Sequence, residues 1–410
     1  MTLLKRSLLS AAAVVVASHA SAADLEVTHW WTSGGEAAAV SEFAKAFDAT
    51  EHTWIDGAIA GSGGTARPII ISRILGGDPM HATQLNHGRQ AEELVEAGLM
   101  LDLSDVAAEG GWADVVNPSR LLDSCTLDGK VYCVPVNIHS PQWLWLSHDA
   151  FAKAGLDVPS DWFEFVKAAP KLREAGVVPL AMGQQSWQTD LAFGAIQVAV
   201  GGTDLYVDVL TNKNAKAAAS AEMTKVFEAY ADARLLSVGS NVNDWNQATN
   251  LVITGQAGGQ IHGDWAQGEF QVAGQVAGKD YTCLPGLGVN EIIATGGDAF
   301  YFPKQDDPAI EAAQKELAKL MISKEVQVAF NLKKGSLPIR GDVDLSAAND
   351  CMKKGLAILA AGNVLPDGVN AFSADTAGQM ADLMVEFWND TSITVEDAQA
   401  RYVDIIATAD

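Results

Sequence analysis

The sequence is short of positive charge. Its 410 residues include 27 lysines and arginines against 51 aspartates and glutamates, a formal net charge of −24. A chain with this excess of negative charge is repelled by nucleic acid and by anionic membrane surfaces, so we expect neither as a partner. Apolar residues make up 48% of the chain, which excludes broad disorder.

Motifs of metal sites and nucleophilic sites are also missing. The sequence contains no C-x-x-C, no H-E-x-x-H and no cluster of cysteine and histidine, so we predict no metal site. It contains no G-x-S-x-G or other nucleophile motif. These absences count against an enzyme, and we expect no cofactor.

A long apolar stretch occurs only at the start of the chain. Lys5 and Arg6 precede an apolar segment at residues 8–17, and small residues follow at Ala20 and Ala22. This order is that of a secretory signal peptide, so we predict that residues 1–22 are removed on export. The segment is too short for a membrane span, no later segment comes close to one, and no cysteine at the junction offers a lipid anchor. We expect a soluble periplasmic protein, in which 25 basic and 51 acidic residues leave a net charge of −26.

The chain has only four cysteines, an even number that suits an oxidising compartment. Cys125 and Cys133 flank the segment TLDGKVY, whose Asp-Gly pair is typical of a two-residue hairpin turn. Such a hairpin would bring the two sulfur atoms together, and we predict a Cys125–Cys133 disulfide. By elimination, Cys283 and Cys351 form the second pair. Four buried free thiols are the alternative.

Strand and helix patterns alternate along the chain. A length of 410 residues exceeds what one hydrophobic core usually supports, so two domains are expected. The first strands are LEVTHWW, WIDGAIAG and HATQLN, and each is followed by a segment with helical apolar spacing. A second alternating series begins after VYCVPVNIHSPQWLWLS. Repeated βα units predict an α/β fold with mainly parallel sheets flanked by helices.

Polar and aromatic residues gather where the predicted strands end. Trp30 and Trp31 close the first strand, and Glu36 follows shortly after. His87 follows the third strand, and Trp265 closes the short strand GQAGGQIHGDW. Ligands of α/β sheets bind beyond the carboxyl ends of the strands, so these residues are candidates for a binding site. Neighbouring side chains of a strand point to opposite faces, so we expect one of the adjacent tryptophans in the core and the other on the site wall.

Several segments resemble the sugar-binding proteins of ABC transporters, an extracellular solute-binding family. They are, in order, GGDP, DAFAKAGLDVPSDWFEF, LVITGQAGGQIHGDW, GGDAFYFPKQDDPAIEAAQKELAKLMIS and NLKKGSLPIR. The opening WW-x-x-G-G-E is most similar to periplasmic glucose- and mannose-type binding proteins. The resemblance implies two α/β lobes of the periplasmic-binding-protein fold, joined by a hinge that the chain crosses three times. It also implies that a sugar binds between the lobes, that the lobes then close, and that the closed monomer docks on the membrane permease.

The resemblance and the alternation of elements place the crossings at similar positions, near residues 136–140, 290–296 and 339–342. We therefore assign residues 1–22 to the signal peptide. The remaining chain divides into two lobes: an N-terminal lobe of residues 23–137 and 293–339, and a C-terminal lobe of residues 138–292 and 340–410.

A sugar presents apolar C–H faces and a ring of hydroxyl groups. Aromatic planes suit the faces, ionised carboxylates accept charge-assisted bonds from hydroxyls, and lysine and histidine supply donors. The resemblance and the strand ends together give seven candidate ligand-binding residues: Trp30, Trp31, Glu36, His87, Trp265, Asp298 and Lys334. Weaker candidates in loops are His139, Trp187 and Gln188.

Four of the candidates also have a structural explanation. Glu36 stands where a carboxylate stabilises the start of a helix. Lys334, or its neighbour Lys333, stands where a cation stabilises the end of a helix. Asp298 follows two glycines and suits a turn, and His87 suits a helix cap.

Two positions depart from the glucose-binding pattern. The loop LNHG lacks the family's lysine, and the segment AFSADTAG lacks its histidine, although Asp375 stands near that place. Both positions would contact sugar hydroxyls, so the ligand could be another hexose, a pentose, a disaccharide or a modified sugar. Two other classes stay open as alternatives. One is an exported glycosidase that uses Glu36 and Asp298, and the other is a binder of a polyamine, a metal or a peptide.

Overall fold

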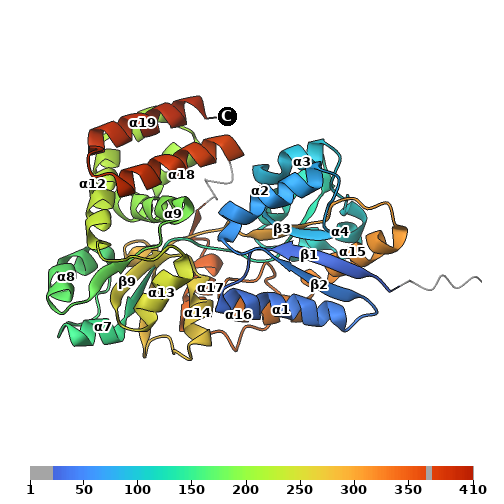
Figure 1. Cartoon of the computed structure of the whole chain (residues 1–410), viewed down its shortest axis with the longest axis horizontal. Coiled ribbons are helices and arrows are strands. Elements are labelled where there is room, and N and C mark those ends of the chain that lie inside the picture. Colours follow the sequence, from blue (N-terminus) through green and yellow to red (C-terminus); the bar gives the residue numbers. More distant parts are fainter. Residues whose placement is uncertain (1–21, 366–371, 410) are drawn as a thin grey trace, which may run out of the picture.

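The computed structural model of the chain describes residues 22–365 and 372–409. Nearly all of the predicted signal peptide, residues 1–21, lies outside the described residues. The helices and strands form two α/β lobes, each with its own sheet, which lie side by side in Figure 1. The predicted fold class of two α/β lobes is confirmed.

The N-terminal lobe contains a five-stranded sheet. In spatial order its strands are β2 (Thr53–Ala58), β1 (Asp24–His29), β3 (Ala82–Asn86), β12 (Asp298–Tyr301) and β6 (Cys133–Pro135). β1 pairs in parallel with β2 and β3, as the alternating pattern predicts, whereas β12 runs antiparallel to β3 and β6. The register of β12 on β3 places Asp298 opposite Asn86. Two segments far apart in the sequence therefore meet at one edge of this sheet.

Helices flank this sheet, with α1 and α16 below it and α2 and α3 above it in Figure 1. α1 buries Val40, Phe43 and Phe47 and packs against α15 and α16. The helices of the lobe are α1 (Gly34–Asp48), α2 (Ser62–Leu75), the 3₁₀ turn η1 (Arg89–Ala91), α3 (Glu92–Glu96), α4 (Ser104–Glu109), α5 (Trp112–Val115), α6 (Arg120–Asp123), α15 (Pro308–Met321) and α16 (Lys324–Lys334).

The C-terminal lobe contains a four-stranded sheet. In spatial order its strands are β10 (Tyr281–Pro285), β7 (Trp143–Ser147), β9 (Ala257–His262) and β8 (Val178–Ala181). β8 and β9 are parallel, but β7 runs antiparallel to both β9 and β10. The prediction of a mainly parallel sheet is therefore wrong for this lobe. β8, β9 and β10 share one direction, and β7 runs in the opposite direction between β9 and β10.

Helices surround this second sheet and extend beyond it toward the C-terminus (Figure 1). They are α7 (His148–Lys153), α8 (Trp162–Glu174), α9 (Ser186–Ile196), η2 (Gln197–Gly201), α10 (Gly202–Tyr206), η3 (Val207–Thr211), α11 (Ala215–Ala218), α12 (Ala221–Leu236), α13 (Trp245–Ile253), α14 (Ala266–Val272), η4 (Gly286–Gly288), α17 (Asp350–Ala360), α18 (Ala374–Asn389) and α19 (Val395–Thr408). Short strand pairs complete the described elements: β4 (Thr126–Leu127) with β5 (Lys130–Val131), and β11 (Ile293–Ala294) with β13 (Val364–Leu365).

One continuous helical stretch, Ser186–Thr211, is long and apolar enough to cross a membrane. The expectation that no segment after residue 22 approaches a span is therefore wrong by length and composition. The stretch is nevertheless a core element, since 56% of its most apolar window is buried inside the protein. Its first part, α9, packs against α12 and α18.

Three segments of the chain are joined where it crosses between the lobes. The backbone N–H of Ile138 donates to the carbonyl of Leu337 at 2.7 Å, and that of His139 donates to the carbonyl of Gly296 at 2.8 Å. Ile138, His139 and Gly296 lie in two of the three regions in which the sequence predicts crossings, and Leu337 lies two residues before the third. The exact limits of the two lobes stay a prediction.

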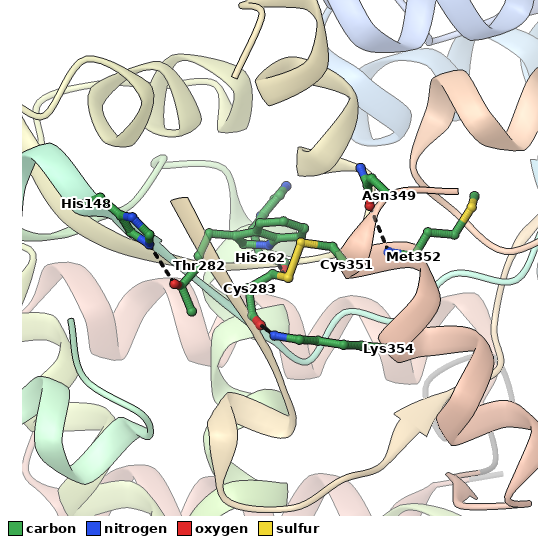
Figure 2. The surroundings of a disulfide bond; sticks show 9 residues. His148, His262, Thr282, Cys283, Asn349, Cys351, Met352 and Lys354 are labelled. Atoms are coloured by element: carbon green, nitrogen blue, oxygen red, sulfur yellow. Dashed lines mark hydrogen bonds between the residues drawn. A yellow bond between two sulfur atoms is a disulfide. The ribbon is translucent and has the colours of Figure 1, made fainter. Parts of the chain in front are cut away.

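Both predicted disulfides are present. The β4–β5 hairpin, whose two turn residues have positive φ, joins Cys125 to Cys133 with their Cα atoms 5.0 Å apart. The second bond joins Cys283 of β10 to Cys351 of α17, with their Cα atoms 6.0 Å apart (Figure 2). Lys354 of α17 also donates to the carbonyl of Cys283 at 2.8 Å (Figure 2). The pairing is confirmed, and the alternative of four free thiols is wrong.

Replacing Cys125 and Cys133 together by alanine is expected to lower the free energy of unfolding by about 2–3 kcal/mol, because the bond closes a short loop in the unfolded chain. Loss of Cys283–Cys351, whose cysteines are 68 residues apart, is expected to lower it further, since the cost of closure grows with loop length. Urea unfolding of the two double variants measures both losses. A larger loss for the shorter loop would contradict the prediction.

Candidate functional site

A cavity of about 1050 Å³ lies between the lobes. The N-terminal lobe contributes the starts of α1 and β12, the ends of β3 and α16, and one face of α2. The C-terminal lobe contributes α9, the start of α14 and one face of α18. Six of the seven sequence candidates line the cavity: Trp30, Trp31, Glu36, Trp265, Asp298 and Lys334.

The two adjacent tryptophans have different surroundings. Trp31 is 1% exposed, and its ring packs among three phenylalanine rings at centroid distances of 5.2, 5.7 and 6.5 Å. Trp30 is 9% exposed and lies under the guanidinium of Arg67, whose central carbon is 5.4 Å from the ring centroid. Trp31 is thus the more deeply packed of the two, although part of it still reaches the cavity. The predicted strand was too long, because β1 ends at His29 and both tryptophans follow it, so strand alternation does not explain the difference.

Glu36 and Lys334 form a buried ion pair on the cavity wall. Ser33 caps α1 by accepting a hydrogen bond from the backbone N–H of Glu36 at 3.4 Å, so Glu36 stands in the first turn. Its Oε1 lies 2.6 Å from Nζ of Lys334, the last residue of α16, which is 2% exposed. That ammonium also lies 5.3 Å from the ring centroid of Trp31 and 6.0 Å from that of Trp265. The two helix ends therefore bring a charged donor and a charged acceptor together.

Asp298 belongs to a buried network centred on His139. Nε2 of His139 lies 2.7 Å from Oδ2 of Asp298, and its Nδ1 lies 2.7 Å from Oδ1 of Asp264. Burial works against a charge on the ring, but the two carboxylates outweigh it and raise the pKa of His139 to about 9. Burial alone would raise the pKa of Asp298, yet the imidazolium lowers it. Asp298 also accepts from Gln84 at 2.9 Å and from Asn137 at 3.0 Å, so its carboxylate is held firmly at the cavity wall.

Trp265 belongs to an aromatic wall of the C-terminal lobe. It immediately precedes α14, three residues beyond the end of β9. Its indole N–H donates to Nε2 of His262 at 2.7 Å. Burial and nearby cations lower the pKa of His262 to about 3, so this ring is neutral and can accept. Trp187, 6.3 Å from Trp265 between ring centroids, and Trp245, stacked on His262 at 5.1 Å, line the same cavity.

Four sequence candidates lie outside the cavity lining: His87, Gln188, Lys333 and Asp375. His87 is 2% exposed, and the preceding Asn86 lines the cavity instead, because successive side chains at a strand end point in opposite directions. Asp375 is exposed on α18 and accepts from Gln379 at 2.7 Å. The weaker candidates His139 and Trp187 both line the cavity.

Sequence reasoning missed Trp245 and two charged residues of the cavity, Arg67 on α2 and Asp190 on α9. Burial lowers the pKa of the Arg67 guanidinium, and Asp298 partly offsets that effect. Burial raises the pKa of the Asp190 carboxyl to about 7. All three stand inside helical patterns rather than at strand ends. Only knowledge of which helix face borders the cavity could have selected them.

The cavity therefore combines aromatic planes with two sets of paired charged groups, Glu36 with Lys334 and Asp298 with His139. This arrangement suits a polar ligand that has apolar faces, because the planes cover the faces while the charged groups exchange hydrogen bonds with its polar rim. In the part of the chain that the structure describes, no group of three or more histidine, cysteine, aspartate or glutamate side chains is arranged to hold a metal ion.

Comparison with known proteins agrees with this geometry. Residues 31–328 match the family described as Bacterial extracellular solute-binding protein. A probable sugar-binding periplasmic protein of Rhizobium meliloti (strain 1021) is 36% identical over 361 residues, which cover 86% of this chain and 85% of that relative. A protein of the same description from Brucella melitensis biotype 1 is 35% identical over 337 residues, which cover 82% of this chain and 79% of the relative.

Solved structures share the fold. A chitin oligosaccharide binding protein superposes with a TM-score of 0.78 over 95% of this chain and 99% of its own, at 18% identity. The fold is that of a two-lobed solute-binding protein with a cavity between the lobes. The chain belongs to the bacterial extracellular solute-binding protein family.

Proposed function

We propose that this protein binds a neutral sugar in the cavity between its lobes and delivers it to the permease of an ABC transporter. The main support is that aromatic planes and paired charges share one cavity. The pairs are Glu36 with Lys334 and Asp298 with His139. Aromatic planes suit the C–H faces of a sugar, and charged acceptors and donors suit its hydroxyls. Relatives named as probable sugar-binding periplasmic proteins support the same class of ligand and the periplasm as the place of action.

The paired charges favour a neutral ligand over a polyamine. Glu36 has a cationic nitrogen at 2.6 Å, and Asp298 has one at 2.7 Å. A polyamine binds best to carboxylates that lack such partners. It would also be repelled by the ammonium of Lys334 and the guanidinium of Arg67 in the same cavity.

The pairing also argues against a glycosidase built on Glu36 and Asp298. Such an enzyme needs one carboxyl group that holds a proton near neutral pH and donates it to the leaving oxygen. The pKa of Asp298 is lowered by His139, and Glu36 directly faces an ammonium. We infer that the protein is not an enzyme, and that sugars incubated with it are recovered chemically unchanged.

Thermal unfolding of the mature chain against a panel of sugars tests the proposal. A ligand that binds only the native state stabilises it by mass action, by about 2.7 kcal/mol at 100 times its dissociation constant. At least one mono- or oligosaccharide is expected to raise Tm, whereas spermidine is not. A panel in which spermidine alone raises Tm would overturn the sugar and favour the polyamine.

We further propose that the mature monomer closes about the three joined crossings, with residues 23–137 and 293–339 moving against residues 138–292 and 340–410. Gln185 before α9 already bridges to the start of α2 through long contacts, 3.5 Å to Ser62 Oγ and 3.4 Å to the carbonyl of Gly61. A ligand held by both lobes favours the arrangement in which these contacts shorten.

Saturating sugar is therefore expected to reduce the radius of gyration of the mature monomer. Small-angle scattering with and without the sugar that raises Tm most measures the change. A variant that does not bind, such as Trp265→Ala, serves as the control and keeps its radius when the sugar is added. An unchanged radius for the saturated wild type would contradict the hinge.

A further inference from the structure

The cavity extends beyond the part that the Glu36–Lys334 ion pair lines, which we call its inner end. One face of α2 lines it from the first turn of the helix to the last residue: Gly64, Arg67, Pro68, Ile71, Ser72 and Leu75. From Gly64 to Leu75 the helix rises by about 16 Å. Figure 1 shows α2 facing α9 and α18 of the other lobe, and both of these helices also line the cavity. A volume of about 1050 Å³ lies at the upper end of pockets that hold drug-sized ligands.

The wall beyond the inner end has the composition of a second sugar site. Pro68, Ile71 and Leu75 of α2 present apolar surface, and Ala377 and Gly378 of α18 leave space opposite. Trp187 and Leu191 of α9 continue the apolar lining away from Trp265. A second ring could lay its C–H faces on these side chains while the first ring occupies the inner end.

Arg67 is an unused donor in this part of the cavity. Its Nε is shielded from solvent, and within residues 22–365 and 372–409 it has no hydrogen-bond partner. The charge of Asp298 partly offsets the burial of Arg67, but that carboxylate already accepts from three side chains. A buried donor left unpaired lowers the stability of the ligand-free protein. A ligand hydroxyl that accepts from Arg67 would recover that free energy on binding.

Asp190 is the matching group on the opposite lobe. It lines the cavity one helical turn beyond Trp187 and forms no hydrogen bond or ion pair with any residue that the structure describes. Burial raises its pKa to about 7, so near neutral pH the carboxyl group can either donate or accept. A sugar hydroxyl, which also does both, is a suitable partner for it.

The charges around Arg67 favour a ligand without charge. Glu36 and Lys334 cancel, and Asp264, Asp298 and protonated His139 leave one net negative charge. The guanidinium of Arg67 balances that charge while Asp190 is protonated, and ionisation of Asp190 makes the site net negative. A sugar acid would add a negative charge to a site that is either balanced or already net negative.

We propose that the ligand is a neutral sugar of at least two linked rings. One ring lies between Trp265 and the Glu36–Lys334 pair, and the next lies along α2, where Arg67 and Asp190 bind its hydroxyls. This proposal rests on the proposed function and specifies the size of the ligand. It assigns to Arg67 and Asp190 a role in ligand binding that does not depend on the inner ring.

Calorimetric titration of the mature protein with paired sugars tests the proposal. The probes are glucose, galactose, mannose and xylose, the disaccharides built from each, and glucuronate. At least one disaccharide is expected to bind about tenfold or more tightly than its own monosaccharide unit. Equal affinity for both lengths, or tightest binding of glucuronate, would overturn the proposal.

Variants separate the second ring from the first. Arg67→Met and Asp190→Asn are each expected to weaken binding of the disaccharide by about tenfold, and to leave the monosaccharide within about twofold. Arg67→Lys, which keeps a donor, is expected to lose less. Arg73→Met is the matched control, because Arg73 of the same helix is paired with Glu26 at 2.5 and 2.9 Å and does not line the cavity. It should bind both sugars as the wild type does.

The outcomes distinguish this proposal from the proposed function. If no sugar of either length binds, both fail. If a monosaccharide binds and no disaccharide improves on it, sugar binding stands and the second ring is refuted. Equal losses for both lengths in Arg67→Met and Asp190→Asn would also refute it, since the two side chains would then serve the inner ring.

Discussion

Replacing Trp265 by alanine is expected to weaken sugar binding by about 30-fold to nearly 1000-fold, equivalent to about 2–4 kcal/mol. The indole stands between the lobes, 6.3 Å from the ring of Trp187 and 6.0 Å from the ammonium of Lys334. Its removal takes away the apolar surface on which a ring would lie. Titration calorimetry of wild type and variant measures the loss, and the change in tryptophan fluorescence on adding sugar should shrink with it.

Two further variants test that interpretation. Trp265→Phe keeps a smaller aromatic plane and is expected to lose less affinity than the alanine variant. Trp112→Phe replaces a buried tryptophan that does not line the cavity and is expected to bind with wild-type affinity. Wild-type affinity in Trp265→Ala would mean that the sugar lies elsewhere. A loss in Trp112→Phe equal to that in Trp265→Ala would point to general destabilisation.

Replacing Lys334 by methionine is expected to lower the free energy of unfolding by about 3–5 kcal/mol in the absence of ligand, because it leaves the carboxylate of Glu36 buried and unpaired. Lys334 and Glu36 are both almost inaccessible to solvent, and their charged atoms are 2.6 Å apart. Chemical unfolding of the ligand-free variant measures the loss.

The chain offers a matched control for this variant. Lys319 pairs with Glu109 at 2.7 Å on the surface, so Lys319→Met is expected to cost at most about 1 kcal/mol. The double variant Lys334→Met with Glu36→Gln removes both charges and should regain most of the lost stability. If the double variant is as unstable as Lys334→Met alone, the cost arises from packing around the lysine stem rather than from an unpaired charge.

Local patterns predicted much of this molecule correctly. The alternation of strands and helices indicated two α/β lobes. It could be recognised because the spacing of apolar residues within one segment shows whether that segment is a helix or a strand. The hairpin around the Asp-Gly turn brought Cys125 to Cys133 by local geometry alone. The strand ends placed Trp30 and Glu36 at the cavity, since the carboxyl ends of parallel strands meet at one edge of a sheet.

Predictions failed where the outcome depended on the direction of a strand or on which way a side chain faces. The position of β7 between two strands that run in the opposite direction depends on the spatial order of the strands in the sheet. His87 is turned away from the cavity, and Asn86 lines it, by the alternation at a strand end. Arg67 and Asp190 look like ordinary helical charges until the opposite lobe is in place.

The sequence by itself therefore determined the elements, the hairpin disulfide and the set of side chains that strand ends carry, because each depends on spacing within one segment. Only the tertiary structure decided how the charges are paired. Glu36 and Lys334 come from opposite ends of the N-terminal lobe's sequence, and His139 lies between an aspartate from each lobe. Charge pairing and burial depend on atoms a few ångströms apart whose separation along the chain is arbitrary. No local sequence pattern encodes charge pairing or burial. Together they decide which polar groups of the cavity can still form hydrogen bonds with a ligand.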